Sequence, residues 1–170
     1  RCETFSTIQE ADWQASVLKQ EQGSTTFEYS YKNERMDVVE IPMIGLHNVR
    51  NALASIACAY HSGISVQDIR IGLQRFIPPK RRLEYIGDWK GRTIIDDFAH
   101  HPTAIKETVR ALRHVYPAKR IHAIFEPRSN TTTRNIFQQE LSSCFTGVDT
   151  IIMGPINRPD RFLPSERLDK

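Results

Sequence analysis

The sequence predicts an α/β protein in two parts, with antiparallel strands and paired helices over residues 1–78 and a parallel-sheet domain over residues 79–170. Apolar residues alternate over residues 25–31, which is typical of a strand, and recur at helical spacing over residues 47–61. From residue 92 onward, strand-like and helix-like segments alternate, an order typical of a parallel sheet with right-handed crossovers. A chain of 170 residues, 39% of them hydrophobic, is long enough to bury such cores.

Three strands are predicted early in the chain, over residues 15–18, 25–31 and 36–41. They are apolar or alternate between apolar and polar residues, and the polar run Lys32–Arg35 between the last two predicts a turn. Because strands joined by a short turn pair in opposite directions, this segment is predicted to form an antiparallel hairpin element.

Two helices are predicted next. The helix over residues 47–61 is expected to end before Gly63, a residue suited to a helix C-terminus. Ser65, with Asp68 three residues later, predicts the start of the second helix through a variant of the capping box. Pro78–Pro79 is expected to stop this helix and to mark the domain boundary. The predicted apolar face of the second helix consists of Ile69, Leu73 and Phe76.

The second part is predicted to begin with two strands that flank a glycine-bounded turn at residues 87–91. The order of the elements predicts a Rossmann-like winding of the sheet. We expect the tail from Pro155 onward to be a loop that leads to a further element, and the chain to be a piece cut from a longer protein. The predicted elements are strands 83–86 and 93–96, a helix near 103–115, strand 120–125, a helix near 133–145 and strand 149–153.

Composition and charge exclude several classes of protein. The net charge of +3 comes from 23 basic and 20 acidic residues without a concentrated basic face, so we expect no nucleic-acid partner. The apolar runs are short and no charged-then-apolar leader is present, so we expect no membrane association and a cytoplasmic protein. The three cysteines are widely spaced and form no Cys-x-x-Cys pair, which argues against a disulfide framework and a zinc cluster. We therefore expect no metal site.

Polar residues follow two of the predicted strands, where ligands bind in open parallel sheets. Asp96–Asp97 and His100–His101 follow the first strand, and Arg128–Asn130 follows the second. The aspartates either cap a helix or bind a ribose, and the arginine segment either binds a carboxylate or phosphate or is a surface loop. The two histidines cannot face one ligand if their backbone is extended, because successive side chains alternate.

Two further groups precede these residues. His47, Asn48 and Asn51 lie at the start of the first predicted helix, where an asparagine often acts only as a cap. Lys80–Arg82 is either a solvated loop or places a guanidinium against phosphates. None of the eight glycines belongs to a phosphate loop or a G-x-G-x-x-G motif, so the chain has no nucleotide cradle of its own.

Three runs of residues, in this order along the chain, resemble the Mur ligases of bacterial cell-wall synthesis: Gly45–Ala54, Arg81–Glu84 and Asp96–Thr103. The resemblance covers essentially the whole chain. It implies that residues 1–78 end a central, ATP-binding domain and that residues 79–170 form a partial C-terminal domain. The phosphate loop, the N-terminal domain and the end of the C-terminal domain would then lie outside the chain.

Within the family, Asp96–Ile105 and Glu126–Thr131 are most similar to the ligase that joins murein tripeptide to UDP-N-acetylmuramate in cell-wall recycling. The tripeptide is L-alanyl-γ-D-glutamyl-meso-diaminopimelate. The resemblance implies an amide-forming reaction in which ATP phosphorylates the muramoyl carboxylate and the amino group of the peptide then attacks the acyl phosphate. Thr132–Arg134 departs from the methionine-containing continuation expected in that ligase.

The resemblance also implies roles for individual residues. Asn51 would read adenine, Asp97 would bind the ribose hydroxyls and Arg82 would lie near the phosphates, with His47 shaping the adenine pocket. The Mg²⁺ ligands would lie mainly outside the chain, no catalytic residue is assigned within it, and the chain alone would be inactive without its remaining domains. The implied substrate-binding residues are His100, His101, Arg128, Ser129 and Asn130.

Two alternatives stay open. One is the neighbouring ligase that joins L-alanine to UDP-N-acetylmuramate, which is distinguished by the segment Glu126–Ser129. The other is a non-catalytic module that binds a nucleotide or a peptide in the same cleft.

Overall fold

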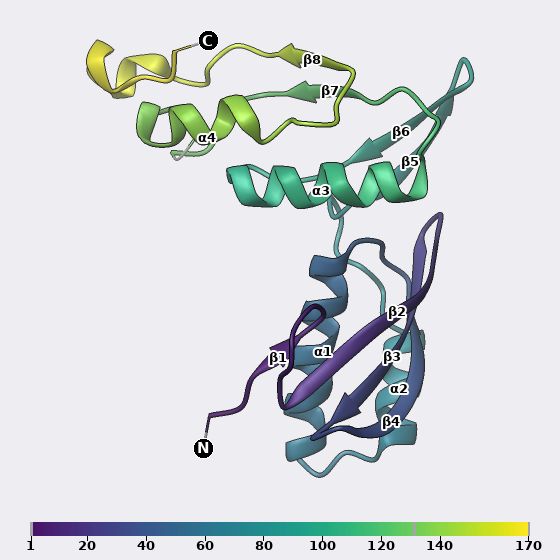
Figure 1. Cartoon of the computed structure of the whole chain (residues 1–170). Helices are drawn as coiled ribbons and strands as arrows, with labels where there is room; N and C mark the ends of the chain where they lie inside the picture. The colour runs from purple at the N-terminus through teal and green to yellow at the C-terminus, as the bar shows by residue number, and fades with distance from the viewer. Residues whose placement is uncertain (1, 131, 170) are drawn as a thin grey trace. The chain divides into compact units, whose positions relative to one another are not determined.

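The computed structural model describes residues 2–130 and 132–169 (Figure 1). Its backbone divides into two compact units, Arg1–Asp96 and Asp97–Lys170. The domain boundary predicted after residue 78 stays a prediction. Among the described residues, no helix is both long and apolar enough to cross a membrane.

The first unit contains a four-stranded sheet in the order β1-β2-β3-β4. The three predicted strands are present and longer than predicted, and they pair antiparallel. The two-residue strand β1 pairs parallel with β2 and was not predicted, because two residues carry no periodic signal. The turn after β3 uses Lys32 and Asn33, both at positive φ, which matches the twist of a hairpin. The strands are β1 (Phe5–Ser6), β2 (Trp13–Glu21), β3 (Ser24–Tyr31) and β4 (Glu34–Ile41).

Both predicted helices of the first unit are confirmed, as α1 (Leu46–His61) and α2 (Val66–Gln74). The Ser65 hydroxyl accepts the Asp68 N–H at 3.1 Å, which confirms the predicted cap. The predicted end of α2 is wrong, because the helix ends before the two prolines and leaves Phe76 beyond it and exposed. A proline disfavours helical backbone at the preceding residue, so the chain leaves the helix before it reaches Pro78.

The core of the first unit lies between the sheet and the two helices. Alternate residues of β3 are buried, including Phe27 and Tyr29, and they pack with Val49 and Leu53 of α1. Helix α1 contacts β2, and α2 contacts β4 (Figure 1). The helices therefore cover this sheet by burying the apolar stripe that their sequences predict.

A hairpin of β5 (Glu84–Trp89) and β6 (Arg92–Asp96) ends the first unit. The predicted five-residue turn is wrong, since β5 continues to Trp89 and only Lys90 and Gly91 form the turn. Both residues have positive φ, 48° and 74°, as a two-residue turn between twisted strands requires.

The second unit contains α3 (Pro102–Val115), β7 (His122–Phe125), α4 (Gln138–Ser143) and β8 (Thr150–Met153). Strands β7 and β8 pair in parallel, which confirms an α/β fold with a parallel-sheet element. The alternation predicted that β6 would join the same sheet, but among the described residues β6 pairs with β5 in an antiparallel hairpin.

The helix predicted over residues 133–145 is shorter than expected. Its first turn is the 3₁₀ segment η1 (Asn135–Phe137), and α4 follows directly. The tail after β8, predicted to be a loop, contains two further 3₁₀ turns, η2 (Pro159–Arg161) and η3 (Pro164–Glu166). The buried core of this unit comprises Ile105, Val109, Phe125, Leu141, Cys144, Phe145 and Leu168.

Candidate functional site

The first turns of α1 carry two of the proposed nucleotide-binding residues, His47 and Asn51. Asn48 between them is buried and donates its amide N–H to the Ile44 carbonyl at 2.8 Å, so it serves the fold. The Asn51 side chain is exposed one turn further along the helix. An exposed amide offers both a donor and an acceptor, which is the chemistry that reading an adenine edge requires.

The two arginines after the prolines have different environments. The Arg81 backbone is at φ 61°, its N–H donates to Glu84 at 2.7 Å, and its Nε donates to Asp96 at 3.2 Å. The Arg82 side chain is exposed. Arg81 and Asp96 therefore support the start of the β5–β6 hairpin, and Arg82 is the better candidate for a phosphate contact.

Asp97 begins the second unit and is oriented by its own neighbours. Its Oδ1 accepts the Ala99 N–H at 2.7 Å and the Thr108 hydroxyl at 3.2 Å. A carboxylate accepts hydrogen bonds at both of its oxygens, and its chemistry suits a bond from a ribose hydroxyl. Asp97 does not cap α3.

His101 caps α3, with its Nδ1 accepting the Thr103 N–H at 3.3 Å and Pro102 at the first helical position. Its ring packs against Phe137, at 4.9 Å between centroids. The ring of His100 instead contacts Phe98 and lies 3.0 Å from the Phe98 carbonyl through Nδ1. The two histidines therefore have separate partners, and both are exposed.

The loop after β7 is held by Ser129. Its carbonyl accepts the N–H groups of Thr132 and Thr133, at 3.1 and 3.0 Å, and the Thr133 hydroxyl at 2.9 Å. Its hydroxyl lies 2.9 Å from the Thr132 hydroxyl. Both threonines are buried, so the positions that depart from the expected family pattern shape this loop. Ser129 is committed to the loop, whereas Arg128 and Asn130 are exposed.

In a full-length protein that contains this chain, we expect Arg128→Lys to raise the KM of the muramoyl or amine substrate about three- to tenfold. Lysine keeps the charge but loses the planar fork that binds a carboxylate through two bonds. Arg128→Ala should raise that KM further, and the KM for ATP should stay unchanged in both variants, as measured by steady-state kinetics. Arg110→Lys, at an exposed arginine of α3, is the control. Wild-type kinetics in both Arg128 variants would show that residues 128–130 form a surface loop that does not bind the substrate.

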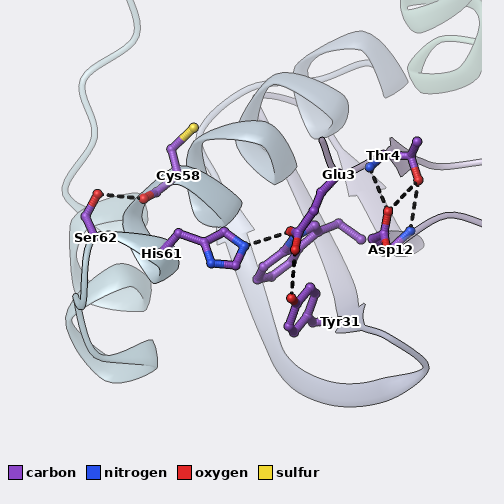
Figure 2. Close-up of polar contacts among 8 residues, drawn as sticks. Glu3, Thr4, Asp12, Tyr31, Cys58, His61 and Ser62 are labelled. Atoms are coloured by element: carbon purple, nitrogen blue, oxygen red, sulfur yellow. Dashed lines mark hydrogen bonds and ion pairs between the residues drawn. The ribbon is translucent and has the colours of Figure 1, made fainter. Parts of the chain in front are cut away.

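A second polar cluster, which sequence reasoning missed, lies in the first unit around Glu3. The Glu3 carboxylate accepts bonds from the Tyr31 hydroxyl at 2.9 Å and His61 Nε2 at 2.7 Å (Figure 2). It also accepts a bond from Trp13 Nε1 at 2.9 Å. Hydrogen bonds from Trp13 and His61, together with the bond from Tyr31, lower the pKa of Glu3 to about 2. Glu3 and His61 are 58 positions apart, so no local spacing could indicate this contact.

We expect the stability of the first unit to fall as the pH decreases from about 4.5 to about 2, in part through Glu3. Its folded pKa of about 2 lies below the ordinary value of 4.5, so the unfolded chain binds the proton first and acid favours unfolding. Glu3→Gln should reduce this pH dependence, measured by urea unfolding at about pH 5 and about pH 3. Glu10→Gln, at an exposed glutamate of the same segment, should keep it. An identical pH dependence in Glu3→Gln and wild type would contradict the prediction.

Comparisons with known proteins match both parts of the chain to domains of one protein family. Residues 81–169 match the model of the Mur ligase glutamate ligase domain, and residues 1–59 match the Mur ligase middle domain. A UDP-N-acetylmuramate–L-alanine ligase of Salinibacter ruber is 35% identical over 90% of this chain and 32% of its own length. The ligase of the same name from Brucella ovis is 40% identical over 75% of this chain and 28% of its own length. The chain thus spans about a third of the length of these relatives.

Two solved structures are also similar. The UDP-N-acetylmuramate–alanine ligase of Thermotoga maritima superposes with a TM-score of 0.75 over 94% of this chain and 35% of its own, at 20% identity, and supports the fold. A murein peptide ligase of Psychrobacter arcticus has a TM-score of 0.54 over 84% of this chain and 30% of its own, at 38% identity.

Proposed function

Because the chain belongs to the Mur ligase family, we propose that it works as part of a longer, ATP-dependent ligase that forms an amide bond on UDP-N-acetylmuramate. The observation that carries this proposal is the 35% identity, over 90% of the chain, to a ligase whose name states that donor. The activity is proposed for the longer protein, since the chain spans about a third of such relatives.

The residues proposed to bind ATP each have side-chain chemistry that suits one part of a nucleotide. The exposed amide of Asn51 and the half-buried ring of His47 lie one turn apart on α1, which suits contact with a flat base. Arg82 supplies an exposed guanidinium, and Asp97 supplies an oriented carboxylate for ribose hydroxyls. ATP would provide the phosphoryl group that activates the muramoyl carboxylate, and the ligands of its Mg²⁺ are proposed to lie mainly outside this chain.

L-Alanine is the acceptor that the names of the curated relatives support. A second candidate is the murein tripeptide. The solved murein peptide ligase is 38% identical to this chain, a value within the 35–40% identity of the curated alanine ligases, so this candidate depends on the resemblance of residues 126–131 to the tripeptide ligase. The loop with Arg128 and Asn130, whose run of residues resembles the tripeptide ligase, would then meet a carboxylate of the peptide.

The test uses the full-length protein with ATP, Mg²⁺ and UDP-N-acetylmuramate, and compares L-alanine with the murein tripeptide as the acceptor. We expect release of inorganic phosphate that requires both the muramoyl donor and one of the acceptors, with the amide product identified by mass spectrometry. The ratio of kcat/KM for the two acceptors decides between the candidates. No acceptor-dependent release with either amine would overturn the proposed function.

The 170-residue chain alone should fold but should neither hydrolyse ATP nor bind it with submicromolar affinity. It offers contacts for the base and ribose but carries no phosphate-loop motif. Isothermal titration calorimetry, with circular dichroism as the check on folding, measures this. A submicromolar Kd would contradict the prediction.

A further inference from the structure

The tail after β8 is bonded to both ends of the loop that follows β7. At the first end, the Asn157 N–H donates to the carbonyl of Pro127, a fully buried residue, at 3.0 Å. At the second end, the Leu168 N–H donates to the Thr133 carbonyl at 3.1 Å, beside an isolated bridge between Arg134 and Arg167. The tail therefore supports the backbone on either side of the exposed residues of the loop.

Side chains hold the end of the tail against η1 and α4. The Gln138 amide makes two bonds to the backbone of Asp169, donating to its carbonyl at 2.7 Å and accepting its N–H at 2.9 Å. Asn135 donates to the Ser165 carbonyl at 2.8 Å. Leu168 is buried in the core of the second unit. Together these contacts keep the Leu168 N–H against Thr133.

Between its two supported ends, the loop is closed on the Ser129 carbonyl, which accepts bonds from Thr132 and Thr133. The side chains of Arg128 and Asn130 extend from this closed turn and are exposed. Their position depends on the backbone of the loop, and the backbone depends in turn on the tail. A small displacement of a binding group is enough to weaken recognition of a substrate.

We propose that the tail, residues 155–169, is a positioning element that holds the loop with Arg128 and Asn130 in place for a carboxylate-bearing substrate, and that Gln138 is one of its side-chain anchors, together with Asn135 and with Arg134, which donates to Glu166 at 3.2 Å. This inference rests on the proposed function. Gln138 is a positioning residue, because it contacts the tail and acts on the substrate only through Thr133 and Ser129.

The test compares Gln138→Ala with Gln139→Ala in the full-length protein. Both glutamines lie in the first turn of α4, but within the described part of the chain only the Gln138 side chain bonds to the tail. Gln138→Ala should raise the KM of the muramoyl or acceptor substrate about three- to tenfold, as expected when a hydrogen-bonded anchor is lost, and should leave the KM for ATP unchanged. Gln139→Ala should behave like wild type. Equal kinetics in the two variants, or an equal rise in the KM for ATP, would overturn the inference.

Amide hydrogen exchange provides a readout that needs no substrate. The N–H groups of Thr132 and Thr133 should exchange faster in Gln138→Ala than in Gln139→Ala or wild type, because their bonds to Ser129 lose support. Unchanged exchange in Gln138→Ala would overturn the role of the tail. If the wild-type protein used neither acceptor, the proposed function would fail, and the exchange measurement would still decide whether the tail holds the loop.

Discussion

Asp97→Ala should raise the KM for ATP of the full-length enzyme about ten- to a hundredfold. Loss of a hydrogen bond to a charged group costs about 1.5 to 3 kcal/mol, which corresponds to that range. Asp97→Asn should raise the KM less, because the amide oxygen can still accept the Ala99 N–H and a ribose hydroxyl. The measurement is the steady-state KM for ATP at saturating concentrations of the other substrates.

The Thr108→Val variant tests whether Asp97 acts by binding the ribose or by supporting the local backbone. It removes the hydroxyl that donates to Asp97 Oδ1 and keeps a side chain of similar shape. If Asp97 binds the ribose, Thr108→Val should change the KM for ATP much less than Asp97→Ala does. An equal rise in both variants would show that Asp97 acts by holding the segment before α3. An unchanged KM in both Asp97 variants would remove Asp97 from the nucleotide site.

Leu53→Ala should lower the free energy of unfolding of the first unit by about 2 to 5 kcal/mol. Leu53 is fully buried between α1 and the sheet, so the substitution removes apolar contacts and leaves a cavity. Trp13 and Trp89 are the only two tryptophans in the sequence, and both lie in the first unit. Tryptophan fluorescence during urea unfolding therefore follows this unit.

Ser55→Ala is the matched control on the same helix. Ser55 is exposed and its hydroxyl donates to the Asn51 carbonyl one turn earlier, so its replacement should change the free energy of unfolding by less than about 0.5 kcal/mol. An effect of Leu53→Ala no larger than that of Ser55→Ala would show that the core described for this unit does not stabilise it.

Most elements of this fold could be predicted from the sequence, because their signals are local. The alternation in β3, the apolar stripe of α1 and the cap at Ser65 each depend on residues within a few positions of one another. The end of α2 and the extent of β5 were not predictable in detail, since both depend on how the backbone leaves one element for the next.

The sequence by itself also determined which polar residues follow the strands. Three of its runs of residues, in their order along the chain, resemble a ligase family. Only the tertiary structure separated Asp96 from Asp97, through Arg81 on one side and Thr108 on the other. It also brought Glu3 to His61 across 58 positions and placed the tail against the loop that carries Arg128. Such contacts depend on the path of the whole backbone, because a hydrogen bond or ion pair forms only where that path brings two groups within about 3 Å, and local propensity does not specify that path.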